Sequence, residues 1–192
     1  MLNERFFRAL IAAALAMSAA CSTTAEQRAA RERNPAPCPN AVVLKDAARL
    51  VEFADPAAPS LQTVKYSGEV TDVALVCRYF ADKPIQATLD VGLAFGRGPD
   101  GEEKNKEFSY FVAVTRRDLE VIEKAVFTVP VSFSDKKNVR VLSERIDELV
   151  IPRAKATTAG TNFEVVVGLV LTPDQARYNR SGRSLKFPDL KP

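Results

Sequence analysis

Residues 163–171 read FEVVVGLVL, and this stretch decides the fold class. Its odd-numbered positions are all large and apolar, whereas its even-numbered positions are Glu164, Val166, Gly168 and Val170. Alternation with a period of two is typical of a β-strand, because successive side chains point to opposite faces of a sheet. The partly apolar second set predicts a central strand whose second face is partly covered.

The same alternation recurs earlier in the chain. Four further rows have it, namely Val73 to Tyr79, Leu89 to Phe95, Phe108 to Val114 and Phe127 to Phe133, with weaker candidates at Val64 to Val70 and Val139 to Val150. Short turn-rich segments separate the rows, and no amphipathic helix lies between them. Residues 38–180 are therefore predicted to form a mainly β domain, an antiparallel two-sheet sandwich of immunoglobulin-like architecture.

Two local signals refine this prediction. Pro130 lacks a backbone N–H and therefore belongs on an edge strand or at a bulge. The segment Gly96 to Glu103 matches neither a phosphate loop nor a calcium loop, and we expect a long exposed hairpin turn there. Weak calcium binding or a partner contact is the alternative for this segment.

Helix signals are few. Thr172, Pro173 and Gln175 match a helix start, with Thr as the cap, Pro in the first turn and Gln three residues after the cap. We expect about two helical turns, ended by Ser181 and Gly182. Residues 46–53 have apolar side chains at helical spacing but fit a strand equally well.

Residues 1–21 read MLNERFFRALIAAALAMSAAC and have the pattern of an export signal. Arg5 and Arg8 precede an apolar run from Ala9 to Met17, and small residues follow up to Cys21. A transmembrane helix needs about 20 apolar residues, so this run is too short to span a bilayer. We predict a signal peptide over residues 1–20.

The end of this segment resembles the lipobox of bacterial lipoproteins. Ala19, Ala20 and Cys21 match that pattern, while Ser18 stands where Leu is usual. The resemblance implies that Cys21 carries diacylglycerol and a further acyl chain such as palmitate, which would anchor the chain to a membrane. Ser22, where an Asp would favour the inner membrane, points to the periplasmic face of the outer membrane. Ordinary signal cleavage, which would release a soluble periplasmic protein, and a buried Cys21 thiol remain alternatives.

Lipidation of Cys21 leaves Cys38 and Cys77 as the only possible pair among three cysteines. An oxidising periplasm favours their disulfide, with two separate buried thiols as the alternative. The preceding stretch, residues 22–37, has no apolar side chain larger than alanine and cannot contribute to a core. Residues 21–37 are therefore predicted to be a lipidated, disordered tether.

The composition excludes several classes of chemistry. The chain has no histidine, which rules out Ser-His-Asp and Cys-His catalysis and every zinc site with a His ligand. Its net charge of +3 is near neutral, so we expect no nucleic-acid partner. Acid pairs such as Asp147 with Glu148, or Asp72 with Glu69, are expected to be solvated or in ion pairs rather than catalytic. We predict no enzyme activity, no metal site and no cofactor.

The most basic region lies at the C-terminal end. Its candidate contacts to an anionic ligand or a protein partner are Arg177, Arg180, Arg183 and Lys186. The alternative is an exposed helix turn followed by a solubilising basic tail over residues 181–192. Tyr178 is expected to fold back and seal one end of the sandwich, if this region is ordered.

Together these features resemble proteobacterial envelope lipoproteins of uncharacterised activity, in which the strand-rich part ends in a segment like residues 168–180. The resemblance adds a location but no activity. Our hypothesis is a non-catalytic membrane-anchored module that binds another envelope protein, with Val139 to Val150 or Val64 to Val70 as edges that accept a partner strand. A periplasmic binding module for a glycan or small ligand is the alternative. The oligomeric state is not predicted.

Overall fold

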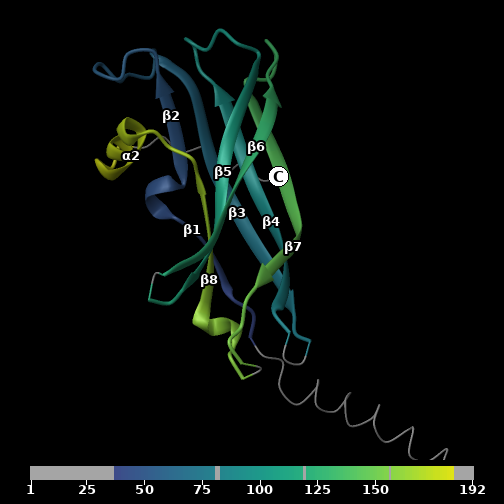
Figure 1. Ribbon diagram of the computed structural model, residues 1–192. Helices are drawn as coiled ribbons and strands as arrows, with labels where there is room; N and C mark the ends of the chain where they lie inside the picture. Colours follow the sequence, from purple (N-terminus) through teal and green to yellow (C-terminus); the bar gives the residue numbers. More distant parts are fainter. Residues whose placement is uncertain (1–36, 81–82, 119, 156, 184–192) are drawn as a thin grey trace, which may run out of the picture. The chain divides into compact units, whose positions relative to one another are not determined.

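The computed structural model describes residues 37–80, 83–118, 120–155 and 157–183. Their strands form two four-stranded sheets, with the order β1-β8-β5-β6 in one and β2-β3-β4-β7 in the other (Figure 1). The predicted signal peptide, Cys21, the tether up to residue 36 and Lys186 lie outside the described residues. The prediction of a mainly β, two-sheet sandwich is confirmed.

In the first sheet, the most buried strand is β8, which covers residues 163–169 of the stretch 163–171. This sheet consists of β1 (Asn40–Val43), β8 (Phe163–Leu169), β5 (Asn105–Arg116) and β6 (Val121–Ser132). β8 is parallel to β1 and antiparallel to β5, so it is an interior strand. Pro130 lies in β6, an edge strand, as predicted.

The second sheet is antiparallel throughout. It consists of β2 (Arg49–Phe53), β3 (Val64–Arg78), β4 (Ile85–Arg97) and β7 (Val139–Ile151). Residues 46–53, ambiguous in sequence, divide between the short 3-10 helix η1 (Lys45–Ala47) and β2. The expectation of a free edge at Val64 to Val70 is wrong, because β2 pairs with β3 there on one side and β4 on the other.

The segment Gly96 to Glu103 is a second correction. It is not a hairpin turn, because β4 belongs to one sheet and β5 to the other. Gly98 N donates to Lys65 O at 2.9 Å, and Glu103 N donates to the Tyr66 hydroxyl at 3.0 Å. The segment is therefore a crossover between sheets, held against β3.

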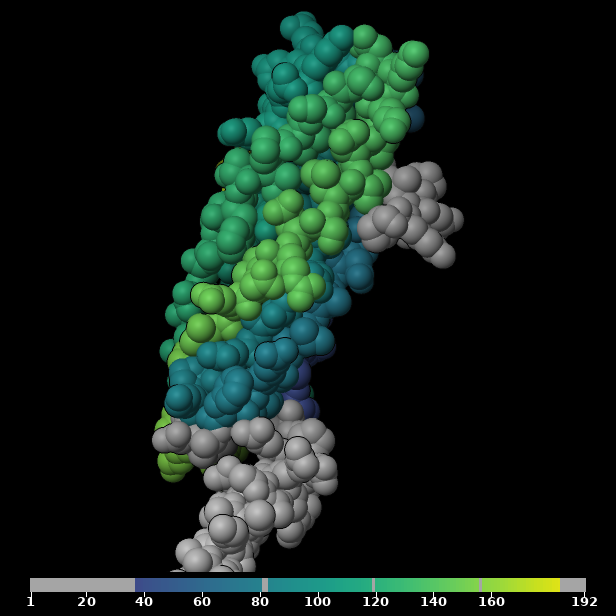
Figure 2. Space-filling view, turned by 90° about the vertical axis from the view of Figure 1, so that its right-hand side faces the viewer, coloured from purple at the N-terminus to yellow at the C-terminus, as the bar shows by residue number. Residues whose placement is uncertain are grey.

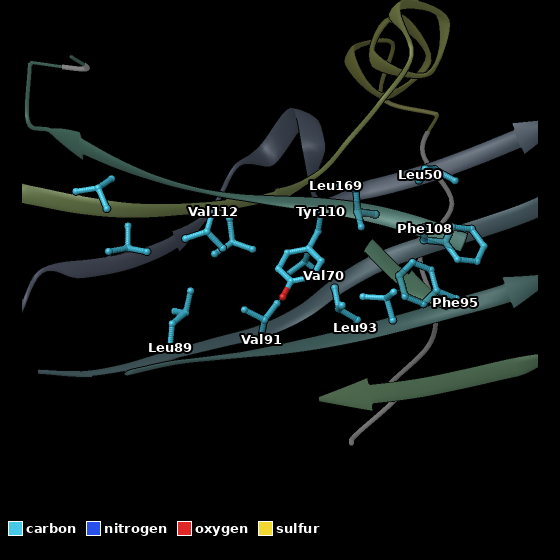
Figure 3. Packing of buried hydrophobic residues seen from close by; sticks show 14 of the residues in the cluster. Leu50, Val70, Leu89, Val91, Leu93, Phe95, Phe108, Tyr110, Val112 and Leu169 are labelled. Carbon is cyan, nitrogen blue, oxygen red and sulfur yellow. The ribbon is translucent and has the colours of Figure 1, made fainter. Parts of the chain in front are cut away.

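The core lies between the sheets, where the alternating apolar rows face one another (Figure 3). Leu89, Val91, Leu93 and Phe95 of β4 are each 0% exposed. The Phe95 and Phe108 rings stack across the sheets with centroids 4.2 Å apart. Burying one such side chain stabilises the fold by about 1.5 to 3 kcal/mol, so this interface supplies most of the driving force for folding.

A single α-helix is described, α2 (Pro173–Arg180), and it begins where the sequence predicts. Thr172 Oγ1 accepts from Gln175 N at 3.3 Å, and Gln175 Oε1 accepts from Thr172 N at 2.8 Å, which completes a capping box. The chain turns after the helix at Gly182, whose φ of 76° favours glycine.

Candidate functional site

The chain enters the sandwich at a junction of three segments. Cys38 and Cys77 form the predicted disulfide, with Cα atoms 5.6 Å apart. The Tyr79 hydroxyl donates to Pro37 O at 2.6 Å and accepts from Gly160 N at 2.7 Å. We call these five residues the N-terminal junction. It joins the start of the described chain to β3 and to η2 (Gly160–Asn162).

The helix α2 is held against η1 and β2 by a second set of contacts. Asn179 Nδ2 donates to Asp46 O at 2.9 Å and to Arg49 O at 2.7 Å. Arg180 Nε donates to Asp46 Oδ2 at 2.8 Å, and the Tyr178 ring meets the Phe53 ring edge-on at 5.1 Å. Tyr178 therefore folds back onto the edge strand β2, as predicted, while its sealing of one end of the sandwich stays a prediction.

A groove lies beside α2, between the helix, β2 and the start of the β2–β3 loop. Its two adjoining parts have volumes of about 350 and 430 Å³ and share Pro56, Asp174 and Tyr178. The part next to β2 is lined by further apolar and polar side chains, namely Val51, Glu52, Phe53, Thr172 and Gln175. The other part is lined in addition by Ala57, Pro59, Arg177 and Arg183. We call the whole surface the α2 groove.

Charge is unevenly distributed along the α2 groove. Glu52 forms an ion pair with Lys106, and Asp174 forms one with Arg177. The Arg183 guanidinium lies 5.4 Å from the centroid of the Tyr178 ring, and its Nε donates to Ser181 Oγ at 3.1 Å. No ion pair involves Arg183 within the described part of the chain. The end of the groove at Arg183 therefore has an excess positive charge.

The structure brings together two of the four basic residues predicted as contacts. Arg177 and Arg183 line the α2 groove, whereas Arg180 is engaged with Asp46 on η1. The sequence patterns did not indicate the other wall of the α2 groove, which is formed by Pro56 to Pro59. Its two prolines and its position just after a strand could have indicated a rigid loop, but not the helix that it faces.

The two long edge strands both carry features that oppose strand addition. In β6, Pro130 removes one backbone donor. β7 is open along this face of the molecule (Figure 2) and has no proline, but Glu144 occupies a core-facing position opposite Val91. The register also shifts between Ala87 and Leu89, which leaves an extra residue in β7. Inward charges and bulges protect edges, so the α2 groove is the better candidate contact site.

One member of each predicted acid pair forms an ion pair. Glu69 contacts Arg49 at 3.0 Å, and Asp147 contacts Arg145 at 2.8 Å. The hydrogen bond that Arg145 donates to Asp147, with the nearby charge of Asp90, raises the pKa of Arg145. Hydrogen bonds from Lys104 and Arg97 lower the pKa of the Asp135 carboxyl. Glu69, Asp147 and Asp135 are therefore each stabilised by a neighbouring cation.

One tyrosine has a strongly shifted pKa. Burial in the core, with a smaller contribution from Glu144, raises the pKa of Tyr110 to about 12. Both causes disfavour the phenolate, so this side chain stays protonated at neutral pH. Its position between the sheets makes it part of the core rather than of the α2 groove (Figure 3).

The described ranges contain no group of three or more His, Cys, Asp or Glu side chains placed to bind a metal ion. They also contain no helix with the length and hydrophobicity needed to cross a membrane.

Comparisons with known proteins add little. No protein-family model matches the chain, and no curated protein matches it. A β-glucuronidase from glycoside hydrolase family 2 contains a structurally similar segment, with 10% sequence identity and a TM-score of 0.27. The match covers 62% of this chain and 12% of that chain. A similarity this low supports no conclusion about the activity of the present chain.

Proposed function

We propose that this chain is a non-catalytic envelope lipoprotein, anchored by lipid on Cys21, whose sandwich binds a segment of another envelope protein in the α2 groove. The observation that carries the binding role is the combination of an aromatic pair, Phe53 and Tyr178, with the guanidinium groups of Arg177 and Arg183. The anchor is supported by the sequence resemblance of residues 18–21 to a lipobox.

The chemistry of the α2 groove suits an extended acidic peptide. Guanidinium groups bind carboxylates through paired N–H donors, and Arg183 has no acidic partner among the described residues. The Phe53 and Tyr178 rings and Pro56 offer apolar area to a neighbouring side chain of the same peptide. A segment with one acidic and one large apolar residue would therefore fill both parts of the groove.

Site-specific photo-crosslinking in cells tests the binding role. A photoreactive amino acid at Ala57, in the wall of the α2 groove, is expected to trap a discrete envelope protein. The same probe at Ala74, an exposed residue of β3, serves as the control position. Arg177→Glu with Arg183→Glu should abolish the Ala57 adduct, whereas Lys136→Glu with Lys137→Glu should preserve it. Equal adducts from both probe positions, or none from Ala57, would contradict the proposal.

Intact mass and membrane fractionation test the anchor. The wild-type chain, expressed in a Gram-negative host, is expected to carry acyl mass and to sediment with the outer membrane. Cys21→Ser should lose both properties. A wild-type chain without acyl mass in the soluble periplasmic fraction would favour ordinary secretion.

A small-ligand function is the second candidate, because a volume of about 350 Å³ falls within the range of small-molecule sites. Thermal-shift measurements with envelope glycans would discriminate between the small-ligand function and the peptide-binding function. A shift that Tyr178→Ala removes and Lys136→Glu leaves intact would favour the ligand; no shift would favour the peptide.

A further inference from the structure

Four segments meet at the end of the sandwich where the chain enters. They are Pro37 with Cys38 and the described parts of the loops after β3 (79–80 and 83–84), after β5 (117–118 and 120) and after β7 (152–155 and 157–159), the last of which continues into η2. Direct contacts join them: Tyr79 to Pro37 and Gly160, Arg153 Nε to Lys83 O at 2.9 Å, and Arg117 N to Asn162 O at 3.2 Å. We call this end of the sandwich the junction end.

The junction end is basic. Its described residues include Arg78, Lys83, Arg116, Arg117, Arg153 and Lys155, against Asp118 and Glu120; Asp82 lies outside the described residues. Glu120 is already engaged, since it forms an ion pair with Arg116 at 3.3 Å. Lys83, Arg117 and Lys155 are all exposed to solvent.

The junction end also exposes an aromatic ring. Phe80 directly follows Tyr79 of the N-terminal junction and is 41% exposed. A large apolar side chain among basic side chains is the pattern of a surface that meets a lipid interface, where the ring enters the headgroup region and the cations bind phosphate.

The opposite end of the sandwich differs in charge. Its loops, at residues 54–63, 98–104 and 133–138, carry Asp55, Asp100, Glu102, Glu103 and Asp135 against Lys104, Lys136 and Lys137. Asp135 there pairs with both Lys104 and Arg97. Among the loops at the two ends, those with an excess of positive charge are therefore at the end from which residues 22–36 lead back to Cys21, whereas Arg177 and Arg183 beside the 54–63 loop belong to the α2 groove.

We infer that the junction end faces the bilayer that holds the lipid anchor, with Lys83, Arg117 and Lys155 against its anionic phosphate headgroups and Phe80 in the headgroup region. This inference rests on the proposed anchor at Cys21. Sixteen peptide steps separate Cys21 from Pro37 and span at most about 55 Å, so the anchor brings the junction end near the bilayer without fixing its orientation. The basic and aromatic side chains supply the orientation, and the α2 groove stays accessible to a partner.

Amide hydrogen exchange of the full acylated chain in vesicles tests this inference. Phosphatidylglycerol-rich vesicles are compared with vesicles of phosphatidylcholine alone. Exchange at the described residues of the loops after β3 and β7 (79–80, 83, 153–155 and 157–159) should slow at least about threefold in the anionic vesicles, because each cation near an anionic surface adds to the attraction. Exchange at residues 98–104 and 133–138 should not change. Added salt should reverse the protection.

Two matched pairs of variants separate orientation from general charge and hydrophobicity. The triple variant Lys83→Glu, Arg117→Glu, Lys155→Glu should lose the protection, whereas Lys45→Glu, Lys136→Glu, Lys137→Glu, with the same change in net charge, should keep it. Phe80→Ser should reduce the protection, and Leu61→Ser, which replaces a 66% exposed residue of the opposite end, should not.

The outcomes distinguish this inference from the proposed function. An acylated chain with equal exchange at both ends, or with no difference between the vesicles, would overturn the inference and leave the anchor intact. An equal loss of protection in both triple variants would overturn it as well. Absence of acyl mass on the same sample would instead overturn the anchor, and with it the premise of the inference.

Discussion

The two ends of the described chain are attached to the sandwich in different ways. At the N-terminal junction, a covalent bond from Cys38 to Cys77 is combined with the Tyr79 hydroxyl, which contacts two other segments. At the other end, α2 is attached by the Asn179 amide, one exposed ion pair and one ring contact. The first attachment joins distant segments of the fold, whereas the second joins one helix to η1 and β2.

This difference indicates where the chain resists opening. Loss of the N-terminal junction releases β1 and the β3–β4 end together, and is therefore expected to affect global stability. Loss of the α2 contacts releases a helix of eight residues whose side chains are not fully buried. Local opening there is expected to precede global unfolding. The following changes test that contrast, in order of decreasing expected effect.

Removal of the disulfide should have the largest effect. The bridge closes a loop with a sequence separation of 39, for which the chain-entropy relation gives about 3 to 4 kcal/mol. Cys38→Ser with Cys77→Ser is expected to lower the free energy of unfolding by that amount in urea titrations, and reduction of the wild type should match it. A loss below about 1 kcal/mol would mean that the noncovalent contacts alone hold this junction.

Gly160→Ala should destabilise the same junction by sterics. A Cβ at this buried position would overlap Pro37 O and the Tyr79 hydroxyl, with Pro39 Cδ at 2.8 Å. Overpacking of this kind is expected to reduce stability by about 2 kcal/mol, measured by thermal unfolding. Adding Tyr79→Phe should recover part of the loss, because one of the overlapping atoms is then absent. Unchanged stability in Gly160→Ala would show that Pro37 and Tyr79 can shift to accommodate the added methyl group without loss of stability.

Asn179→Ala should release α2. The change leaves the Asp46 and Arg49 carbonyl groups without their amide donor, which costs about 1 to 2 kcal/mol. Faster amide exchange is expected at residues 173–180, with little change in the strands. Arg177→Ala on the same helix is the control, since among the described residues Arg177 forms an ion pair only with Asp174 of that helix. If Asn179→Ala accelerated amide exchange in the strands as much as in α2, the α2 contacts would matter for global stability, and the contrast with the N-terminal junction would be wrong.

Thr172→Ala should have the smallest effect. It removes the oxygen that accepts from Gln175 N, for an expected loss of about 1 kcal/mol in helix stability. The measurement is again amide exchange across α2. Thr172→Ser, which retains the hydroxyl oxygen, should behave like the wild type; a large effect of the serine variant would assign the role to the methyl group instead.

Local sequence patterns predicted most of the strands correctly because burial imposes a period of two. The row from Leu89 to Phe95 is buried as expected, and the helix start at Thr172 follows from capping chemistry. The wrong predictions concern pairing. Alternation predicts a free edge at Val64 to Val70 and a hairpin at Gly96 to Glu103, and both are wrong, because alternation shows which side chains are buried but not which strand lies alongside.

The sequence by itself determined the fold class, the position of α2 and the disulfide pair, while the export signal at residues 1–20 stays a prediction. The fold class follows from alternation along each strand, α2 follows from its capping residues, and the disulfide pair follows from the number of cysteines. The tertiary structure alone decided that Arg183 and the Pro56 to Pro59 loop border one groove, and that Lys83, Arg117 and Lys155 share the end where the chain enters. These residues are far apart in the chain. The docking of α2 on η1 and β2 brings Arg183 beside the Pro56 to Pro59 loop, the pairing of β4 with β7 brings the Lys83 and Lys155 loops to one end, and the packing of the two sheets adds Arg117.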